Sequence, residues 1–340
     1  MNIEDGNTTG SEFDPHSNCT LPDIRTTPLY QNKNVFLFYL VSFVIICVLI
    51  LLGNSIVLWA FATDQKIRSR KYVLIFSLCL TDLATGFVIP IQILAPPSVI
   101  DAFGFSLLLI SVSTNLAIAV DRFYILVVAN LNISRKGATA KQLIIFCVLL
   151  WVGILAFILP WTIYPYYYIL ILYTLGPWSV VAIMIGVTGL YISIFYTMRK
   201  MDKQKQKKLG KGDFKRTKMV VRAYAVIVVC FGVCWLPWCI EAIRISFESY
   251  FTPDNQSCYV ASIVACFLLN FGLLNSAINP LIYWRKLHDF RHAINNLPIF
   301  RRCMTRCCVD NPESTTGRTR MHNNYQDGTA VYDGREVQLE

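Results

Sequence analysis

The chain has 340 residues, of which 55% are hydrophobic and 15% are charged. A water-soluble domain carries about a quarter charged residues, so this composition excludes an ordinary soluble enzyme or binding module. The formal net charge of +10 would suit nucleic-acid binding, but no nucleic-acid-binding motif is present. The basic residues lie between apolar runs, where we expect them to face lipid headgroups or a partner protein.

Seven apolar runs predict seven membrane-spanning helices, because each can cross about 30 Å of hydrocarbon. The runs cover residues 35–61, 72–94, 102–128, 143–163, 169–197, 220–246 and 260–284. Pro96 and Pro97 separate the second run from the third because proline stops a helix. We therefore predict an all-α membrane protein, with the helix bundle in residues 35–298 between terminal tails over 1–34 and 299–340.

The positions of the basic residues predict the orientation of the bundle, since Lys and Arg are enriched in cytoplasmic loops. They gather in the loops after the first, third and fifth runs: Lys66, Arg68, Arg70, Lys71, Arg135, Lys136, Lys141 and residues 199–218. The N-terminal tail is then extracellular, and the protein is expected in the plasma membrane. The sequons at Asn7, Asn18 and Asn255 fall on the predicted outer side, where glycosylation occurs, whereas Asn132 falls inside.

The segment after the seventh run predicts a short amphipathic helix. Leu287, Phe290 and Ile294 share one helical face, which suits a helix lying on the inner leaflet. Beyond it, Cys303, Cys307 and Cys308 lie among arginines and are either palmitoylated or free thiols. The last thirty residues are polar and are expected to be disordered.

Polar side chains inside the apolar runs are candidate functional residues, because burying them in hydrocarbon is costly. They include Asn54, Asp82, Ser111, Asn275, Ser276 and Asn279. A carboxylate surrounded by neutral oxygens suits a Na⁺ ion. A water-filled hydrogen-bond network with Asp82 protonated is the alternative.

Three further patterns lie in the third, sixth and seventh runs. Asp121 and Arg122 form a pair at the inner end of the third, which either restrains the arginine until a partner competes or merely anchors it at the interface. Pro237 in the sixth run and Pro280 in the seventh each remove a helical hydrogen bond, which predicts a kink at each position.

Together these motifs resemble rhodopsin-like (class A) G-protein-coupled receptors over about residues 35–298. The motifs are Gly53-Asn54, Leu80-Thr81-Asp82-Leu83, Asp121-Arg122-Phe123, Trp151, Cys234-Trp235-x-Pro237 and Asn279-Pro280-x-x-Tyr283. The resemblance implies that Arg122, helped by Tyr191 and Tyr283, engages a heterotrimeric G protein. It also implies that Phe231 and Trp235 relay ligand binding, that Na⁺ binds at Asp82, Ser111, Asn275 and Asn279, and that arrestin and receptor kinases are candidate partners.

The chain departs from that family at its outer side. It lacks the usual cysteine at the outer end of the third helix and a partner in residues 164–178. A bridge between Cys19 and Cys258 is an alternative that some related receptors have, with Cys239 as a rival partner. The stretch from Asp82 to Asp121 is also short, which leaves a missing segment possible. The short second outer loop is similar to the melanocortin, lysophospholipid, cannabinoid and adenosine receptor branch.

The resemblance implies a pocket for a small-molecule, lipid or peptide ligand in the outer half of the bundle. Its candidate residues are Asp101, Gly104, Trp238, Glu241, Arg244 and Asn270. Glu241 and Arg244 could instead form an ion pair with each other on one helix, and Tyr164 to Tyr168 are expected to be an interfacial belt. Rival interpretations are a transporter, which would show broken helices or intramembrane charges, and a seven-helix protein without ligand or signal. No enzymatic activity is expected.

Overall fold

The computed structural model describes residues 32–94, 99–128, 137–164, 171–205, 211–251 and 255–300, with only the backbone described at several helix ends. The main helices are α2 (Lys33–Thr63), α3 (Val73–Leu94), α4 (Val99–Phe123), α6 (Ala140–Ile158), α8 (Gly176–Lys205), α9 (Lys211–Phe251), α10 (Asn255–Lys286) and α11 (His288–Asn295). Within the described ranges, 7 helical segments are long and apolar enough to cross a membrane. The prediction of seven spans in an all-α fold is confirmed.

Short irregular turns extend or connect these helices. They are η2 (Gln65–Ile67) and η3 (Arg70–Tyr72) between α2 and α3, η4 (Tyr124–Val128) after α4, η5 (Leu159–Ile163) after α6, and η6 (Ile171–Leu175) before α8. Local sequence starts α6: Thr139 and Gln142 form a reciprocal capping box, which satisfies backbone donors that have no partner within the helix.

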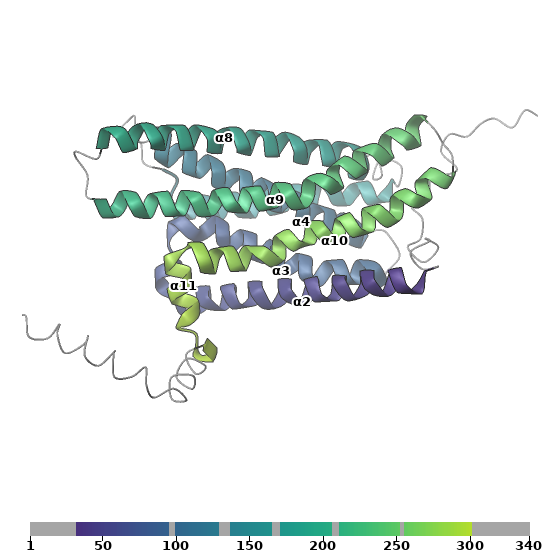
Figure 1. The fold of residues 1–340 in the computed structure, drawn as a ribbon, viewed down its shortest axis with the longest axis horizontal. Coiled ribbons are helices and arrows are strands. Elements are labelled where there is room, and N and C mark those ends of the chain that lie inside the picture. The colour runs from purple at the N-terminus through teal and green to yellow at the C-terminus, as the bar shows by residue number, and fades with distance from the viewer. Residues whose placement is uncertain are drawn as a thin grey trace, which may run out of the picture.

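Two helices run well beyond the apolar stretches from which they were predicted. The run over 220–246 becomes α9, Lys211–Phe251, and the run over 260–284 becomes α10, Asn255–Lys286. Hydropathy marks the part that suits hydrocarbon, whereas backbone hydrogen bonds continue a helix into polar sequence. Both helices also continue through their prolines, Pro237 and Pro280, and α9 changes direction along its course in Figure 1.

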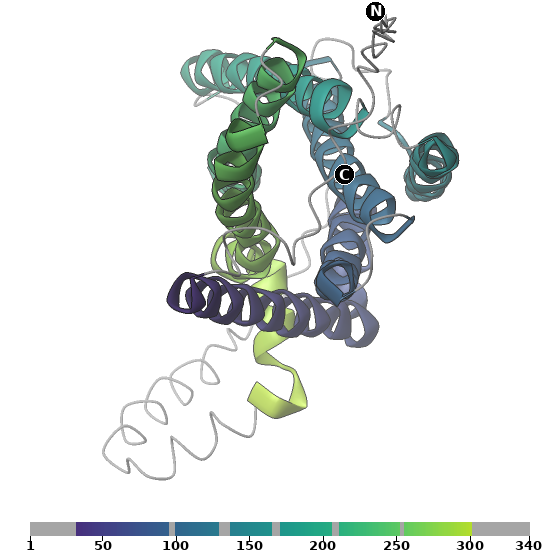
Figure 2. The same ribbon diagram turned by 90° about the vertical axis from the view of Figure 1, so that its right-hand side faces the viewer.

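The helices run side by side along the long axis of the molecule (Figure 1) and form a ring when they are seen end-on in Figure 2. The short helix α11 lies across one end of the bundle, which we call the α11 end. The opposite end, where α4 begins and α9 ends, is called the far end. Large apolar side chains such as Leu149 and Ile185 are exposed on the bundle, as expected for helices surrounded by lipid.

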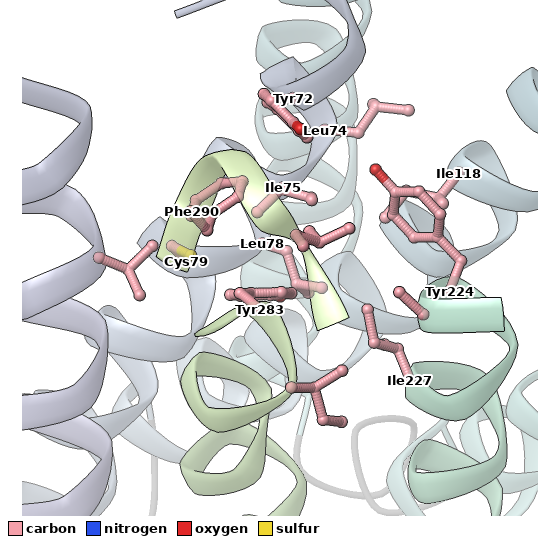
Figure 3. Packing of buried hydrophobic residues seen from close by; sticks show 14 of the residues in the cluster. Tyr72, Leu74, Ile75, Leu78, Cys79, Ile118, Tyr224, Ile227, Tyr283 and Phe290 are labelled. Carbon is pink, nitrogen blue, oxygen red and sulfur yellow. The ribbon is translucent and has the colours of Figure 1, made fainter. Parts of the chain in front are cut away.

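Buried apolar side chains form one cluster toward the α11 end, a second toward the far end, and a smaller third one among α2, α3 and α10. The cluster at the α11 end joins α2, α3, α4, α6, α8, α9, α10 and α11, and part of it is shown in Figure 3. The far-end cluster joins α4, α6, η6, α8 and α9 around Phe105, Trp235 and Trp238. Gly176 at the start of α8 makes this packing possible, because a Cβ there would overlap the Phe105 ring.

Candidate functional site

Asp82 of α3 is the centre of a polar group in the middle of the bundle. Its carboxylate is fully buried and accepts hydrogen bonds from Ser276 Oγ at 2.7 Å and Asn279 Nδ2 at 2.9 Å. Asn54 of α2 donates its amide to the Ser276 backbone oxygen at 3.2 Å. These hydrogen bonds join α2, α3 and α10, three of the helices in which the sequence showed polar residues inside apolar runs.

Several buried oxygens of the predicted Na⁺ set have no hydrogen-bond partner among the described residues. They are Ser111 Oγ, Asn275 Oδ1 and Asn279 Oδ1. A buried oxygen without a partner is costly and is usually satisfied by an ion or water. One carboxylate with neutral oxygens is a donor set that a monovalent cation can use, so these residues fit a Na⁺ ion.

Arg122 at the end of α4 has partners on two other elements. Its Nη2 atom donates to the Lys71 backbone oxygen at 2.6 Å and to the Tyr224 hydroxyl at 3.0 Å. The guanidinium also lies 4.8 Å from the centre of the Tyr224 ring. Since only 11% of the Arg122 side chain is exposed, these contacts connect α4, η3 and α9 in a largely water-free setting, where they are stronger than at a surface.

The neighbouring Asp121 does not form a close ion pair with Arg122. The nearest charged atoms of the two residues are 3.9 Å apart, whereas Arg70 Nη2 approaches Asp121 Oδ1 to 2.5 Å. Arg70 also donates to the Ala138 backbone oxygen. Asp121 is therefore neutralised mainly by η3, which leaves Arg122 to bind the Lys71 oxygen and Tyr224.

The same turn, η3, holds the short helix α11 in place. Lys71 Nζ lies 2.6 Å from Asp289 Oδ2, and the Tyr72 hydroxyl donates to the same oxygen at 2.8 Å. Phe290 lies between the rings of Tyr72 and Tyr283, as Figure 3 shows. The face with Leu287, Phe290 and Ile294 is shared as predicted, but it is buried against the bundle.

Tyr191 and Tyr283, which the resemblance assigned to Arg122, do not hydrogen-bond to it in this structure. Their hydroxyls are buried and have no partner within the described ranges. Tyr224 takes that place, although sequence reasoning missed it. The only signal was a tyrosine near the start of the sixth apolar run, at the same end of the bundle as Arg122. Lys71 was counted only as a basic loop residue.

Trp235 in α9 is closely packed with residues from neighbouring turns and from α10. Its indole meets Phe231 at 6.4 Å and Trp238 at 6.0 Å between ring centres. A Cβ at Gly272 of α10 would lie 2.8 Å from the indole, so the glycine makes room for it. The predicted relay residues Phe231 and Trp235 are thus in contact, within the same helix as Pro237.

The predicted ligand residues at the far end lie in several different settings. Arg244 forms two hydrogen bonds to Glu241, at 2.8 and 2.7 Å, which is the ion pair on one helix that the sequence offered as an alternative. The Asn270 amide donates to Ser42 Oγ at 3.3 Å, toward α2. Asp101 lies in the first turn of α4, and Gly104 is buried on the same helix.

Some predicted sites lie outside the part that the structure describes. These are the sequons at Asn7 and Asn18, the side chain of Asn255, both members of the Cys19–Cys258 bridge, and the thiols of Cys303, Cys307 and Cys308. Their modification and pairing stay predictions. The rival disulfide partner Cys239 is a free, buried cysteine, so it does not form the bridge here.

Comparisons with known proteins agree with this geometry. The family described as 7 transmembrane receptor (rhodopsin family) matches residues 53–283, a range that starts and ends on the first and last motifs singled out above. The adenosine receptor A2a of Equus caballus is 25% identical over 77% of this chain and 72% of that receptor. The sphingosine 1-phosphate receptor 1 of Danio rerio is 26% identical over 74% of this chain and 76% of its own length.

Other matches are shorter. A 5-hydroxytryptamine receptor of Heliothis virescens is 35% identical, but over only 24% of this chain and 16% of that receptor. All three similar proteins are receptors by name, so these matches do not favour a transporter or a non-signalling protein.

Proposed function

Because the chain belongs to the rhodopsin family of seven-transmembrane receptors, it is a G-protein-coupled receptor, and we propose that Arg122 is its contact with the G-protein α-subunit. The proposal includes an orientation with the α11 end in the cytoplasm of a cell and the far end outside the plasma membrane. The basic residues Arg70, Lys71, Arg285 and Lys286 near the α11 end support that orientation.

The observation that carries this proposal is the set of partners that hold Arg122. A backbone oxygen and a tyrosine hydroxyl bind it, while Asp121 is neutralised by Arg70. An arginine held by neutral groups can exchange them for a partner's groups without leaving a buried carboxylate unpaired. The arrangement therefore suits a resting state in which Arg122 becomes available when α9 moves.

The far end would receive the ligand, and Trp235 would pass its effect along α9. The indole touches Phe231 and the backbone of α10 at Gly272, so a ligand that shifts Trp235 displaces α9 against α10. Pro237 lies two residues beyond Trp235 and removes a backbone hydrogen bond, which makes a bend there less costly. The ligand is an extracellular small molecule, lipid or peptide; the relatives named above are receptors for adenosine, sphingosine 1-phosphate and 5-hydroxytryptamine.

The polar centre would regulate this movement through Na⁺. Asp82, Ser111, Asn275 and Asn279 would hold the ion, which would supply a positive charge to the buried carboxylate. Ser276 and Asn279 already orient that carboxylate. Because the residues come from α3, α4 and α10, an ion bound by all of them stabilises the helix arrangement in which they meet.

The test of the G-protein contact is Arg122→Ala in cells that express several G-protein types in turn. Dissociation of each G protein is measured with and without candidate ligands, and the receptor at the cell surface is counted. We expect signalling to fall about tenfold or more, because an interface arginine in a desolvated site carries much of the binding energy. Lys33→Ala, which removes an exposed basic side chain at the start of α2 at the far end, is the control. Full signalling by Arg122→Ala would refute the proposed contact.

A further inference from the structure

Lys71 contacts three different helices through two of its groups. Its ammonium binds Asp289 of α11 at 2.6 Å. Its backbone oxygen accepts a hydrogen bond from Arg122 of α4 at 2.6 Å and a longer one from Tyr224 of α9 at 3.4 Å. One residue therefore connects α11 to the arginine that we assign to the G protein.

The backbone of Lys71 is held on both sides by its neighbours in η3. Arg70 is paired with Asp121 and bonded to the Ala138 oxygen. Tyr72 is almost fully buried, and its hydroxyl binds the same Asp289 oxygen that Lys71 binds. The position of the Lys71 oxygen thus depends on the contacts that η3 makes with α4 and with α11.

Asp289 is well placed to hold this turn. It lies in the first turn of α11, where the helix dipole favours a carboxylate, and only 14% of its side chain is exposed. The next residue, Phe290, is fully buried and packs on Tyr72 and Tyr283. A displacement of α11 would therefore move the carboxylate and the two aromatic contacts together.

We propose that Asp289 is a positioning residue, which through Lys71 holds the backbone oxygen that restrains Arg122. The docking of α11 on the bundle then sets how readily Arg122 is released, although Asp289 itself contacts neither Arg122 nor the G protein in this role. This inference rests on the proposed role of Arg122. It differs from a restraint between α4 and α9 alone, because it adds α11 as a third helix that controls the same arginine.

The size of the effect follows from the kind of bond. Hydrogen bonds to charged groups are stronger than neutral ones and depend on the position of both partners. A protein whose two conformations differ by a few kcal/mol populates the minor one at roughly 0.1–10%, so weakening one bond that holds the resting state raises the active fraction measurably. We expect a rise in ligand-independent signalling of about three- to tenfold.

The experiment compares ligand-independent G-protein dissociation, per receptor at the cell surface, among four variants. Asp289→Ala removes the link at α11, Lys71→Met removes the ammonium, and Lys71→Arg keeps the charge. Tyr224→Phe removes only the hydroxyl, which accepts from Arg122 and donates to the Lys71 oxygen. Asp289→Ala, Lys71→Met and Tyr224→Phe should raise ligand-independent signalling by similar factors. Lys71→Arg should resemble the wild type. If Asp289→Ala reaches the surface poorly, Lys71→Met carries the same test.

Two matched controls separate positioning from general loosening of the structure. Asp64→Ala removes another carboxylate near α11, which lies 4.0 Å from His292. It also removes the cap of η2, because Asp64 accepts a hydrogen bond from Lys66 N at 2.8 Å, so it loosens the neighbouring turn without removing the bond between Lys71 and Asp289. Tyr196→Phe removes a hydroxyl from an exposed tyrosine of α8. Both should signal like the wild type. Equal activation by Asp64→Ala and Asp289→Ala would overturn the proposal.

The double variant Asp289→Ala with Tyr224→Phe gives the sharpest test. If both residues act on the restraint of Arg122, the combined increase differs from the product of the two single increases, whereas independent effects multiply. A full product, or an unchanged signal in Asp289→Ala and Lys71→Met, overturns the proposal. Arg122→Ala is measured in the same cells: if it still signals, the proposed G-protein contact has failed; if it is silent, only the role of Asp289 has failed.

Discussion

The two ends of the bundle use charged side chains in different ways. At the α11 end, the two shortest ion pairs among the described residues join separate elements: Arg70 pairs with Asp121, and Lys71 pairs with Asp289. At the far end, Glu241 and Arg244 pair within α9, and a neutral hydrogen bond between Thr174 and Ser246, at 2.5 Å, joins η6 to α9. A contact between helices changes when the helices move, whereas a contact within one helix does not. The α11 end is thus built to respond to helix movement.

The largest effect on stability is expected from Phe290→Ala at the α11 end. Phe290 is fully buried and touches Phe61, Tyr72 and Tyr283. Removing a buried phenylalanine costs about 3–5 kcal/mol. The unfolding temperature of the purified receptor in detergent should be clearly lower in Phe290→Ala than in the wild type. Phe157→Ala, at an exposed site of α6, should have little effect, and equal losses in both would show that α11 is not part of the core.

A smaller loss is expected from Gly272→Ala, which tests the packing of Trp235. The new Cβ would lie 2.8 Å from the indole, and overpacking of this kind costs about 1–3 kcal/mol. Gly153→Ala on α6 is the matched control, because nothing lies within 4 Å of its Cβ. The free energy of unfolding of that variant should rise by about 0.5–1 kcal/mol, because alanine favours a helix more than glycine does. The same measurement of unfolding would therefore show opposite signs at the two glycines.

The polar centre between the two ends is tested by Na⁺. We expect NaCl to raise the unfolding temperature of the wild type above its value in choline chloride of equal ionic strength. At ten times the dissociation constant, one bound ion stabilises by about 1.4 kcal/mol. Asp82→Asn should abolish the difference between the two salts, because the ion loses its counter-charge. A Na⁺ effect that survives in Asp82→Asn would show that the ion binds elsewhere.

The smallest effect is expected from Glu241→Gln at the far end. The side chain of Arg244 is 42% exposed, so it stays hydrated when its partner is neutralised. Pairs three residues apart on a helix contribute about 0.2–0.5 kcal/mol. The free energy of unfolding, obtained from thermal unfolding, should fall by an amount within that range. A loss as large as that of Gly272→Ala would mean that the pair also holds another helix, and the contrast between the two ends would weaken.

The sequence alone predicted the elements and several of the important residues. Long apolar runs cannot be stable in water, and their backbone must form hydrogen bonds internally in lipid, so the seven helices followed from composition. Asp82, Ser276 and Asn279 were recognisable because a polar group inside an apolar run needs a partner. The apolar face of α11 was visible from the spacing of Leu287, Phe290 and Ile294.

The partners of those residues depended on the tertiary structure. The Lys71 backbone oxygen has no signature in the sequence, and Tyr224 is an ordinary residue until α9 brings it to Arg122. Spacing showed that α11 has an apolar face, but whether lipid or protein covers that face depends on how α11 folds back onto α2, α3 and α10. Hydropathy and periodicity are properties of one segment, whereas a hydrogen bond between helices depends on the relative positions of two.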